Sequence, residues 1–472
     1  MEILSKCHRT CNNMDKFSSL PDHIVHKITS YLSLKDISRL SVVSRRCRQV
    51  CISSPFLVFD LIPYSNNQPK RVRLINYIDR LLFLRNGKNI EWCYISWCMQ
   101  SSLVNEEEYR ILSWLHNAVA CNAKMLNLQL NLRRESYFAL PTSLLSSTSL
   151  TALEVNLHNG AILKIPSSST AITSLKYLTL NSLRIDKSFG DWVLSCCKSL
   201  MVLSLVKIDG TKSINITSSS LKALMVVCPR NLFNLQVCAE TLESMILHWT
   251  FSNPDNRVLQ LSAPKLGTFV WNGKISEVQL EANFMCLNFA GILVTPSSST
   301  DQNLVHLLRA LRKVRDLHIS YNCLQGGLPI LFTSMSTIVI YNVGDAWDDL
   351  LPTIISLFEA APNLICLSVK NKCFPFQYPH NFPSKEESDC GRSMLCSESE
   401  NIPFMHNLRF VRIELALRRW NVLELIKYLL KNTKNLQKMT IICDPLSFSD
   451  VRREISGYEK ASSEAEVEFY SL

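Results

Sequence analysis

A short apolar phrase recurs along the chain from about residue 123 onward. In each copy apolar residues occupy the first, fourth and sixth positions, as Leu150, Leu153 and Val155 do in a clear early copy. Clear neighbouring copies begin 21 to 29 residues apart, and a less regular stretch precedes residue 314. This regularity predicts a repeat architecture. The copies begin at Leu150, Leu175, Leu200, Leu221, Leu242, Leu266, Val314, Met335, Leu364, Leu408 and Leu436.

The alternating end of each phrase predicts a β-strand whose apolar side chains share one face. No single copy can bury that face, so neighbouring copies must stack into a solenoid with one continuous core. The period and the L-x-x-L-x-L spacing are typical of leucine-rich repeats. We therefore predict an α/β fold: a curved solenoid with a parallel sheet on its concave face, preceded by N-terminal helices and closed by a helical and strand cap.

Residues 15–60 show helical rather than strand periodicity and predict three short amphipathic helices. Pro21 suits a first helical position, with Asp22 in the opening turn, and Ser33 and Asp36 have the spacing of a capping box. So small a unit must pack on its own chain or on a partner. The apolar positions are Ile24, Ile28, Tyr31 and Leu32, then Ile37, Leu40 and Val43, then Cys47, Val50 and Cys51.

Two features near the C-terminus differ from the repeats. Residues 421–431 predict a helix with Asn421 as N-cap, and we expect it to shield the open edge of the last strands. A partner-binding helix is the alternative. Residues 377–403 are acidic and rich in serine, which predicts a disordered loop, either a tolerated insertion or a site of phosphorylation or partner contact. The helix's apolar stripe is Val422, Leu425, Ile426, Leu429 and Leu430.

Composition argues against several classes of function. With 12 glycines in 472 residues, the chain has no glycine-rich phosphate-binding motif, so nucleotide chemistry is not expected. The formal net charge of +10 is spread along the sequence without a basic stripe interleaved with aromatic residues, so we expect no nucleic-acid partner.

The 18 cysteines are scattered and form no C-x-x-C pair. Cys7, His8 and Cys11 come nearest to a metal-ligand cluster, and we predict free thiols in a reducing compartment, with no metal and no cofactor. The N-terminus lacks an apolar leader segment, and no apolar run reaches membrane-spanning length. We therefore expect no membrane partner and a location in the cytoplasm, the nucleus or both.

The helical segment at 15–60 resembles an F-box. The match rests on Leu20-Pro21-Asp22 followed by apolar residues at the spacing of that motif and by Ser44-Arg45. The resemblance implies docking on a Skp-type adaptor and, through it, on a cullin. Cys47 occupies the position at which the family usually has Trp, which leaves the third helix a smaller anchor. The residues to which the resemblance assigns adaptor contact are Leu20, Pro21, Ile24, Ile28, Leu32, Leu40 and Val43.

The order of motifs after residue 60 resembles plant F-box proteins that carry leucine-rich repeats and end in an FBD module. This implies a tail at 1–14, an F-box at 15–60, a helical linker and first-repeat cap at 61–122, a solenoid at 123–398 and FBD-like repeats with a cap at 399–472. The motifs are Trp114-Leu115-His116-Asn117-Ala118, Leu126-Asn127-Leu128, Ser174-Leu175-Lys176-Tyr177-Leu178, Asn407-Leu408-Arg409 and Asn435-Leu436-Gln437-Lys438-Met439.

The resemblance implies a substrate-recognition subunit of a Skp-cullin-F-box ubiquitin ligase, which binds a target whose identity the sequence does not give. The alternative is a repeat scaffold that does not work through a ligase. An enzyme is not expected, because the ten histidines flank no recognisable nucleophile motif. The favoured target surface is the concave strand face, on which side chains such as Tyr177, Thr179, Arg315, His318, Phe410 and Arg412 point outward.

Overall fold

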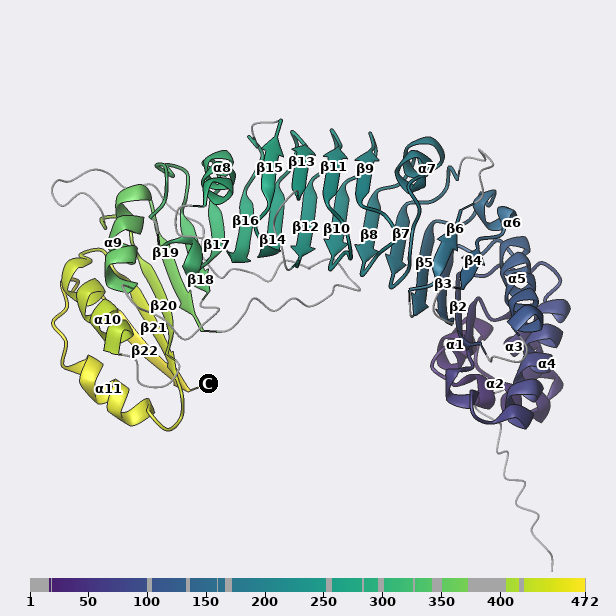
Figure 1. Cartoon of the computed structure of the whole chain (residues 1–472). Helices are drawn as coiled ribbons and strands as arrows, with labels where there is room; N and C mark the ends of the chain where they lie inside the picture. Colours follow the sequence, from purple (N-terminus) through teal and green to yellow (C-terminus); the bar gives the residue numbers. More distant parts are fainter. Residues whose placement is uncertain are drawn as a thin grey trace, which may run out of the picture. The chain divides into compact units, whose positions relative to one another are not determined.

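A computed structural model of the chain confirms the predicted α/β architecture, with N-terminal helices followed by long runs of parallel strands (Figure 1). Contacts are dense within residues 1–211 and within residues 212–472, and each of these two units is described by itself. The predicted tail at 1–14 and the whole of the predicted loop at 377–403 lie outside the residues that the structure describes. These are 17, 19–99, 104–132, 136–158, 160–165, 172–251, 257–281, 284–295, 301–325, 327–341, 350–371, 405–415 and 420–471.

The first unit opens with the three predicted helices, α1 (Asp22–Thr29), α2 (Leu34–Val43) and α3 (Arg45–Ser53). Helix α1 begins one residue later than predicted, with Pro21 as its N-cap. The predicted restart at Ser33 is present: the Asp36 backbone N–H donates to the Ser33 hydroxyl oxygen at 3.2 Å, and that hydroxyl donates to the Asp36 carboxylate at 2.6 Å. Short capped helices thus form where the sequence offers polar starts.

Parallel strands follow directly in the first unit. Segments that connect them are η1 (Ile62–Tyr64), α4 (Gln68–Leu84), α5 (Val104–Ala120), α6 (Thr142–Leu145) and α7 (Phe189–Cys196), and β4 (Tyr137–Ala139) pairs with β6 (Ile162–Lys164) outside the main ladder. The neighbouring strands of the ladder are, in order, β1 (Phe56–Asp60), β2 (Trp92–Cys98), β3 (Met125–Asn131), β5 (Ala152–His158), β7 (Tyr177–Asn181) and β8 (Val202–Val206).

The second unit continues the same pattern. The segments between its ladder strands form η2 (Tyr321–Cys323) and the helices α8 (Gln302–Ala310), α9 (Leu350–Ala360), α10 (Trp420–Asn432) and α11 (Phe448–Ser456). Other such segments form a second parallel sheet of β9 (Ser213–Thr217), β11 (Asn234–Cys238), β13 (Val258–Ser262) and β15 (Glu277–Leu280). The neighbouring ladder strands are β10 (Ala223–Val227), β12 (Ser244–Trp249), β14 (Thr268–Lys274), β16 (Phe289–Thr295), β17 (Asp316–Ser320), β18 (Thr337–Tyr341), β19 (Cys366–Lys370), β20 (Phe410–Leu415), β21 (Lys438–Cys443) and β22 (Glu466–Ser471).

The predicted phrase residues form the core of both ladders. Leu153 lies directly opposite Leu178, and Leu178 lies opposite Leu203, so equivalent positions stack from strand to strand. In all eleven predicted copies the apolar residues at the first, fourth and sixth positions are buried. We call the other sheet face, whose side chains point away from this core, the strand face. Since only the core side must be apolar, residues on the strand face are free to serve binding.

The sequence missed copies of the phrase where small or polar residues replace leucine. Leu287, Ala290 and Ile292 form a buried copy in β16, within the stretch that looked irregular. The ladder also begins at Phe56 rather than at residue 123, because β1 and β2 pair in parallel within the ranges assigned to the F-box and the helical linker. Cys93 occupies the fourth position of the copy that contains β2, where most copies have a larger apolar residue, so the sequence pattern did not reveal this copy.

Helix α10 corrects a predicted role. Its apolar stripe is buried as expected, but the helix connects β20 to β21 and packs against α9 and α11. The last strand of the ladder among the described residues is β22, which α10 does not cover. Asn421 lies inside the helix, which begins at Trp420, rather than at its N-cap. A helix between parallel strands lies against the sheet and leaves its edge uncovered.

A buried arginine joins helices α1 to α3 to the first strands. Arg85 follows α4 and is fully buried, and its guanidinium donates to the carbonyl oxygens of Ile52 at 2.9 Å and Ser54 at 2.6 Å. It also donates to the carbonyl oxygens of Lys88 at 3.0 Å and Asn89 at 2.9 Å. The end of α3 and the turn before β2 are therefore held by one side chain.

None of the helices among the described residues is long and apolar enough to cross a membrane. The described cysteines are free thiols, and no group of acidic, histidine and cysteine side chains among the described residues could hold a metal ion. The Cys7, His8 and Cys11 cluster lies outside those residues.

We predict that Arg85→Leu lowers the free energy of unfolding of the chain by roughly 3 kcal/mol, because it removes the donors to two buried carbonyl groups and to two that are partly buried. Arg85→Lys should recover part of this loss, since one ammonium group cannot reach both pairs of carbonyls. The measurement is urea unfolding followed by circular dichroism. Arg80→Leu, an exposed position on the helix that Arg85 follows, is the matched control and should change stability little. Equal effects at the two positions would contradict the assigned role.

Candidate partner-binding surfaces

Helices α1 and α2 and the turn between them expose several large apolar side chains. Ile24 and Ile28 are 40% and 41% exposed, and Tyr31, Val42 and Val43 are between 72% and 77% exposed. We call these five residues the exposed apolar set. Large apolar side chains that gather on a small unit and find no cover in their own chain mark an interaction site.

The other faces of the same helices are packed inside the chain. Val25 and Thr29 on α1 and Leu34 on α2 are buried, as are Val50 and Cys51 on α3. The apolar stripe that the sequence revealed on α1 is therefore the outer one, while the inner face uses Val25 and Thr29. Two apolar faces on one short helix require two packing partners, of which the chain itself supplies one.

The predicted adaptor contacts can now be placed. Pro21, Ile24, Ile28 and Val43 are exposed, and Leu20, Leu32 and Leu40 are half-buried, so each retains some accessible surface. Sequence reasoning left Tyr31 and Val42 out of the contact residues. For Val42 a signal was present, because two consecutive valines at the end of α2 cannot both face the same core.

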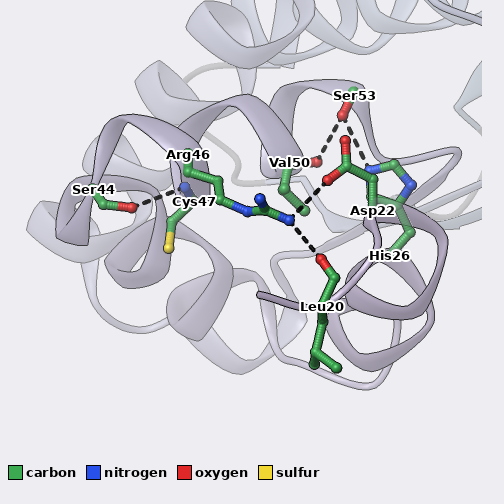
Figure 2. A network of polar contacts seen from close by, with 8 residues as sticks. All are labelled: Leu20, Asp22, His26, Ser44, Arg46, Cys47, Val50 and Ser53. Atoms are coloured by element: carbon green, nitrogen blue, oxygen red, sulfur yellow. Dashed lines mark hydrogen bonds and ion pairs between the residues drawn. The ribbon is translucent and has the colours of Figure 1, made fainter. Parts of the chain in front are cut away.

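Polar contacts hold the start of α1 against α3, as Figure 2 shows. The Arg46 guanidinium donates to the Leu20 carbonyl oxygen at 2.5 Å and to the Asp22 carboxylate at 3.2 Å. His26 Nε2 lies 3.1 Å from the Ser53 hydroxyl, which donates to the Val50 carbonyl. Because the Arg46–Asp22 pair is exposed, it adds little stability. The contacts of Arg46 instead fix the direction in which the chain at Leu20 and Pro21 enters α1.

Partial burial of the His26 ring lowers its pKa, an effect that the Asp22 carboxylate partly offsets. The neutral ring therefore predominates at neutral pH and, because the Ser53 hydroxyl gives its one proton to the Val50 carbonyl, the ring donates Nε2–H to the Ser53 oxygen. This contact joins the middle of α1 to the end of α3, so the start and the middle of α1 are both held against α3.

Cys47 lies on the inner side of α3 rather than on a surface that a partner can reach. It is 5% exposed, and its backbone N–H donates to the Ser44 hydroxyl oxygen at 3.0 Å, which caps the helix (Figure 2). The expectation that this residue acts as a reduced anchor for the adaptor is therefore corrected. Its small size affects how the three helices pack on one another.

The six side chains proposed on the strand face do point away from the core. Tyr177, Arg315 and Arg412 are exposed, while Thr179, His318 and Phe410 are partly buried. They come from both units, so the structure does not group them as one site.

His318 belongs to an aromatic cluster on the strand face of the second unit. Its ring lies 4.8 Å from that of Phe289, edge to face, and its Nδ1 is 3.3 Å from the Tyr341 hydroxyl. Burial, with a smaller contribution from the nearby Lys370 ammonium, lowers the pKa of His318 to about 4. The ring is therefore neutral at physiological pH and packs as an aromatic side chain.

Comparisons with known proteins agree with this architecture. Residues 17–59 match the family model of the F-box domain, and residues 111–288 match the leucine-rich repeats of FBD-associated F-box protein At5g56370. The chain thus carries an F-box followed by leucine-rich repeats, and F-box domains generally bind Skp-type adaptors.

Two relatives from Arabidopsis thaliana extend over almost the whole chain. F-box/FBD/LRR-repeat protein At1g78750 is 23% identical over 96% of this chain and 96% of its own length. FBD-associated F-box protein At4g13985 is 24% identical over 91% of this chain and 90% of its own. The predicted resemblance to plant F-box proteins with leucine-rich repeats and an FBD module is confirmed.

We predict that Cys47→Trp destabilises the first unit, because the larger ring overpacks a buried site, at a cost of about 1–3 kcal/mol. Adaptor binding should not improve once the folded fraction is taken into account. Cys47→Ala is the matched control, since it removes little volume. Thermal unfolding of both variants is the measurement, and a Trp variant as stable as the parent with tighter adaptor binding would contradict the inner position of Cys47.

We also predict that His318 makes stability fall on acidification. In the unfolded chain the histidine has its ordinary pKa near 6.5, whereas in the folded chain its pKa is about 4. Between these two values the unfolded state binds a proton that the folded state does not bind. Stability is therefore lost as the pH falls from about 6.5 to about 4, by roughly 3 kcal/mol from this group. Urea unfolding across this range should show a flatter pH dependence for His318→Gln. The exposed His306→Gln is the control and should keep the parental slope.

Proposed function

We propose that this protein is the substrate-recognition subunit of a Skp-cullin-F-box ubiquitin ligase. Helices α1 to α3 bind a Skp-type adaptor, and through it a cullin, while the strand face binds a target protein. The observation that carries the proposal is the exposed apolar set on α1 and α2, on helices whose inner faces are already packed. The F-box match at residues 17–59 supports it.

The proposed mechanism is proximity, without chemistry by this chain. A target held on the repeats has a high effective concentration near a ubiquitin-loaded enzyme that the cullin recruits. Rigid connection favours such a mechanism, because the bound target must stay oriented relative to the adaptor. Arg85 provides that connection within the first unit by holding the end of α3 to the turn before β2. We propose that the protein acts in this way in the cytoplasm, the nucleus or both.

The second candidate function is a repeat scaffold that works without a ligase. It shares the fold and the strand face and differs only in the role of α1 and α2. In that case the exposed apolar set would bind another partner or a second copy of the chain. Adaptor binding by the intact protein separates the two functions directly.

We predict that Ile24→Asp combined with Ile28→Asp abolishes capture of a purified Skp-type adaptor. Because the two isoleucines are 40% and 41% exposed, each would lose only about 1 kcal/mol of apolar burial, but each aspartate would also place an unpaired charge in the apolar contact. Together these costs should lower the affinity by more than about 100-fold. The fold should survive, since both side chains are substantially exposed. The measurement is adaptor binding by surface plasmon resonance, with unfolding midpoints recorded for each variant.

Leu446→Asp is the matched control for this experiment, because Leu446 is 91% exposed and lies in the second unit. It introduces the same charge on an apolar surface position and should leave adaptor capture unchanged. A doubly substituted α1 that still holds the adaptor with parental affinity would contradict the proposed site and favour the scaffold.

A further inference from the structure

The last strand of the second unit leaves one side of the sheet open (Figure 1). β22 pairs with β21 along one side, and no described strand pairs with its other side. In the first unit, by contrast, the first strand β1 lies against helix α2. An open strand edge presents a row of backbone N–H and C=O groups with which another extended chain can pair. β22 is therefore a place at which the main ladder can accept a further strand.

The register of β22 determines which of its backbone groups face the open edge. The Glu466 N–H donates to the Gln437 carbonyl oxygen at 2.9 Å, so the even-numbered residues of β22 bond to β21. In a parallel pair, the residues of a strand alternate in the side to which both of their backbone groups point. The odd-numbered residues therefore each present a donor and an acceptor to the open edge. They are Val467, Phe469 and Ser471.

The core side of this edge is apolar and incompletely covered. Val467 and Phe469 continue the rows of core residues on β21, yet both are only partly buried. No described repeat follows them, and the Arg452 guanidinium, 5.9 Å from the centre of the Phe469 ring, covers part of that ring. A strand that pairs here with apolar side chains on the same face would bury the remaining apolar surface.

The strand face beside the edge carries an excess of negative charge. Glu466 and Glu468 lie on this face of β22, and Lys438 is the one cation on the same face of β21. The Lys438 ammonium lies 2.7 Å from the Glu468 carboxylate, which also accepts from the Tyr470 hydroxyl at 2.8 Å. Glu466 is exposed and forms no ion pair with a described residue. Basic side chains on an added strand would therefore be attracted to this face.

A second copy of this chain suits the edge poorly. When two identical strands pair antiparallel about a two-fold axis, each brings the same carboxylates to the same face of the joined sheet. Like charges that face one another across a pair of strands are destabilising. Glu466 and Glu468 thus oppose self-association, a common protection of exposed edges, but they attract a strand of opposite charge.

We propose that the open edge of β22 binds an extended segment of a partner protein in which basic and apolar residues alternate. The segment adds a strand to the ladder by pairing its backbone with Val467, Phe469 and Ser471. Its apolar side chains cover Val467 and Phe469, and its basic side chains face Glu466 and Glu468. This surface lies outside α1 to α3 and does not depend on the proposed function.

The test uses the full chain and a short fluorescein-labelled peptide of alternating lysine and valine. A second peptide replaces every lysine with glutamate. Binding is measured by fluorescence anisotropy, and we expect the lysine peptide to bind at least about fivefold more tightly. Since the whole chain has a net charge of +10, non-specific attraction would favour the glutamate peptide, so a preference for lysine reports a local acidic surface. Equal binding, or tighter binding of the glutamate peptide, would overturn the proposal.

Backbone methylation of the lysine peptide tests strand addition itself. The valine N–H groups of the peptide face β22 in an antiparallel arrangement, and its lysine N–H groups face β22 in a parallel one. We expect methylation of one set to weaken binding at least about tenfold, and methylation of the other set to change it less than about twofold. Equal effects of the two methylations would contradict pairing through the backbone.

Val467→Pro tests the edge from the side of the protein. It removes a backbone N–H that faces the open edge and no bond to β21, so it should weaken the lysine peptide at least about tenfold while the unfolding midpoint changes little. Val467→Ala, which keeps this N–H, is the control and should weaken the peptide less. Parental affinity in the proline variant would overturn the assigned edge. A dimer of the parent chain in sedimentation velocity that Val467→Pro dissociates would make a second copy the occupant and overturn the choice of a partner.

Glu466→Lys tests the charge of the edge and should abolish the preference for the lysine peptide. Glu240→Lys is the matched control, since Glu240 is an exposed glutamate of the same unit, and it should retain the full preference. A preference that survives Glu466→Lys would overturn the choice of a basic segment.

Discussion

The guanidinium of Arg85 satisfies four carbonyl groups that belong to two different parts of the first unit, and the packing of the F-box helices depends on it. A buried arginine is costly to desolvate, and the four carbonyl oxygens that accept from its two terminal nitrogens offset that cost, while Nε has no acceptor among the described residues. Because the acceptors come from the end of α3 and from the turn before β2, the helices and the first strands cannot separate without exposing all of them. The F-box is therefore held against the first strands by buried hydrogen bonds rather than by a flexible linker.

A second constraint acts along the strands. Equivalent core residues stack directly from strand to strand, so each repeat buries the apolar face of the next. Repeats of 21 to 24 residues leave too few residues for a helix and its turns, and in the second unit they carry the short strands β9, β11, β13 and β15 on the other side. Longer repeats carry helices such as α8 and α9. Core stacking is thus kept constant while the strand face varies, which is how one fold can carry different binding surfaces.

The sequence predicted the repeats and the helices well because both are periodic signals repeated many times. It failed where one residue carried the information. Cys93 and Ala290 occupy core positions normally filled by larger side chains, so the copies in β2 and β16 did not stand out. The stripe on α10 identified its buried face but not the neighbours α9 and α11, because periodicity is silent about what covers a face. The role of Arg85 could not be predicted for the same reason. A single arginine after a helix is expected to be exposed to solvent unless the carbonyl groups around it are known.

The two candidate surfaces differ in the physics of recognition, and this difference suits their proposed roles. The exposed apolar set on α1 and α2 offers burial of hydrocarbon, a strong and undirected contribution appropriate to a constant partner. The strand face offers oriented polar groups, which add little affinity when matched but penalise a wrong ligand heavily by leaving buried groups unpaired. A receptor that must hold one adaptor and discriminate among many targets needs this division. The adaptor surface should therefore tolerate exchange among apolar residues, whereas the strand face should not tolerate even the isosteric replacement of a polar side chain that pairs with a ligand.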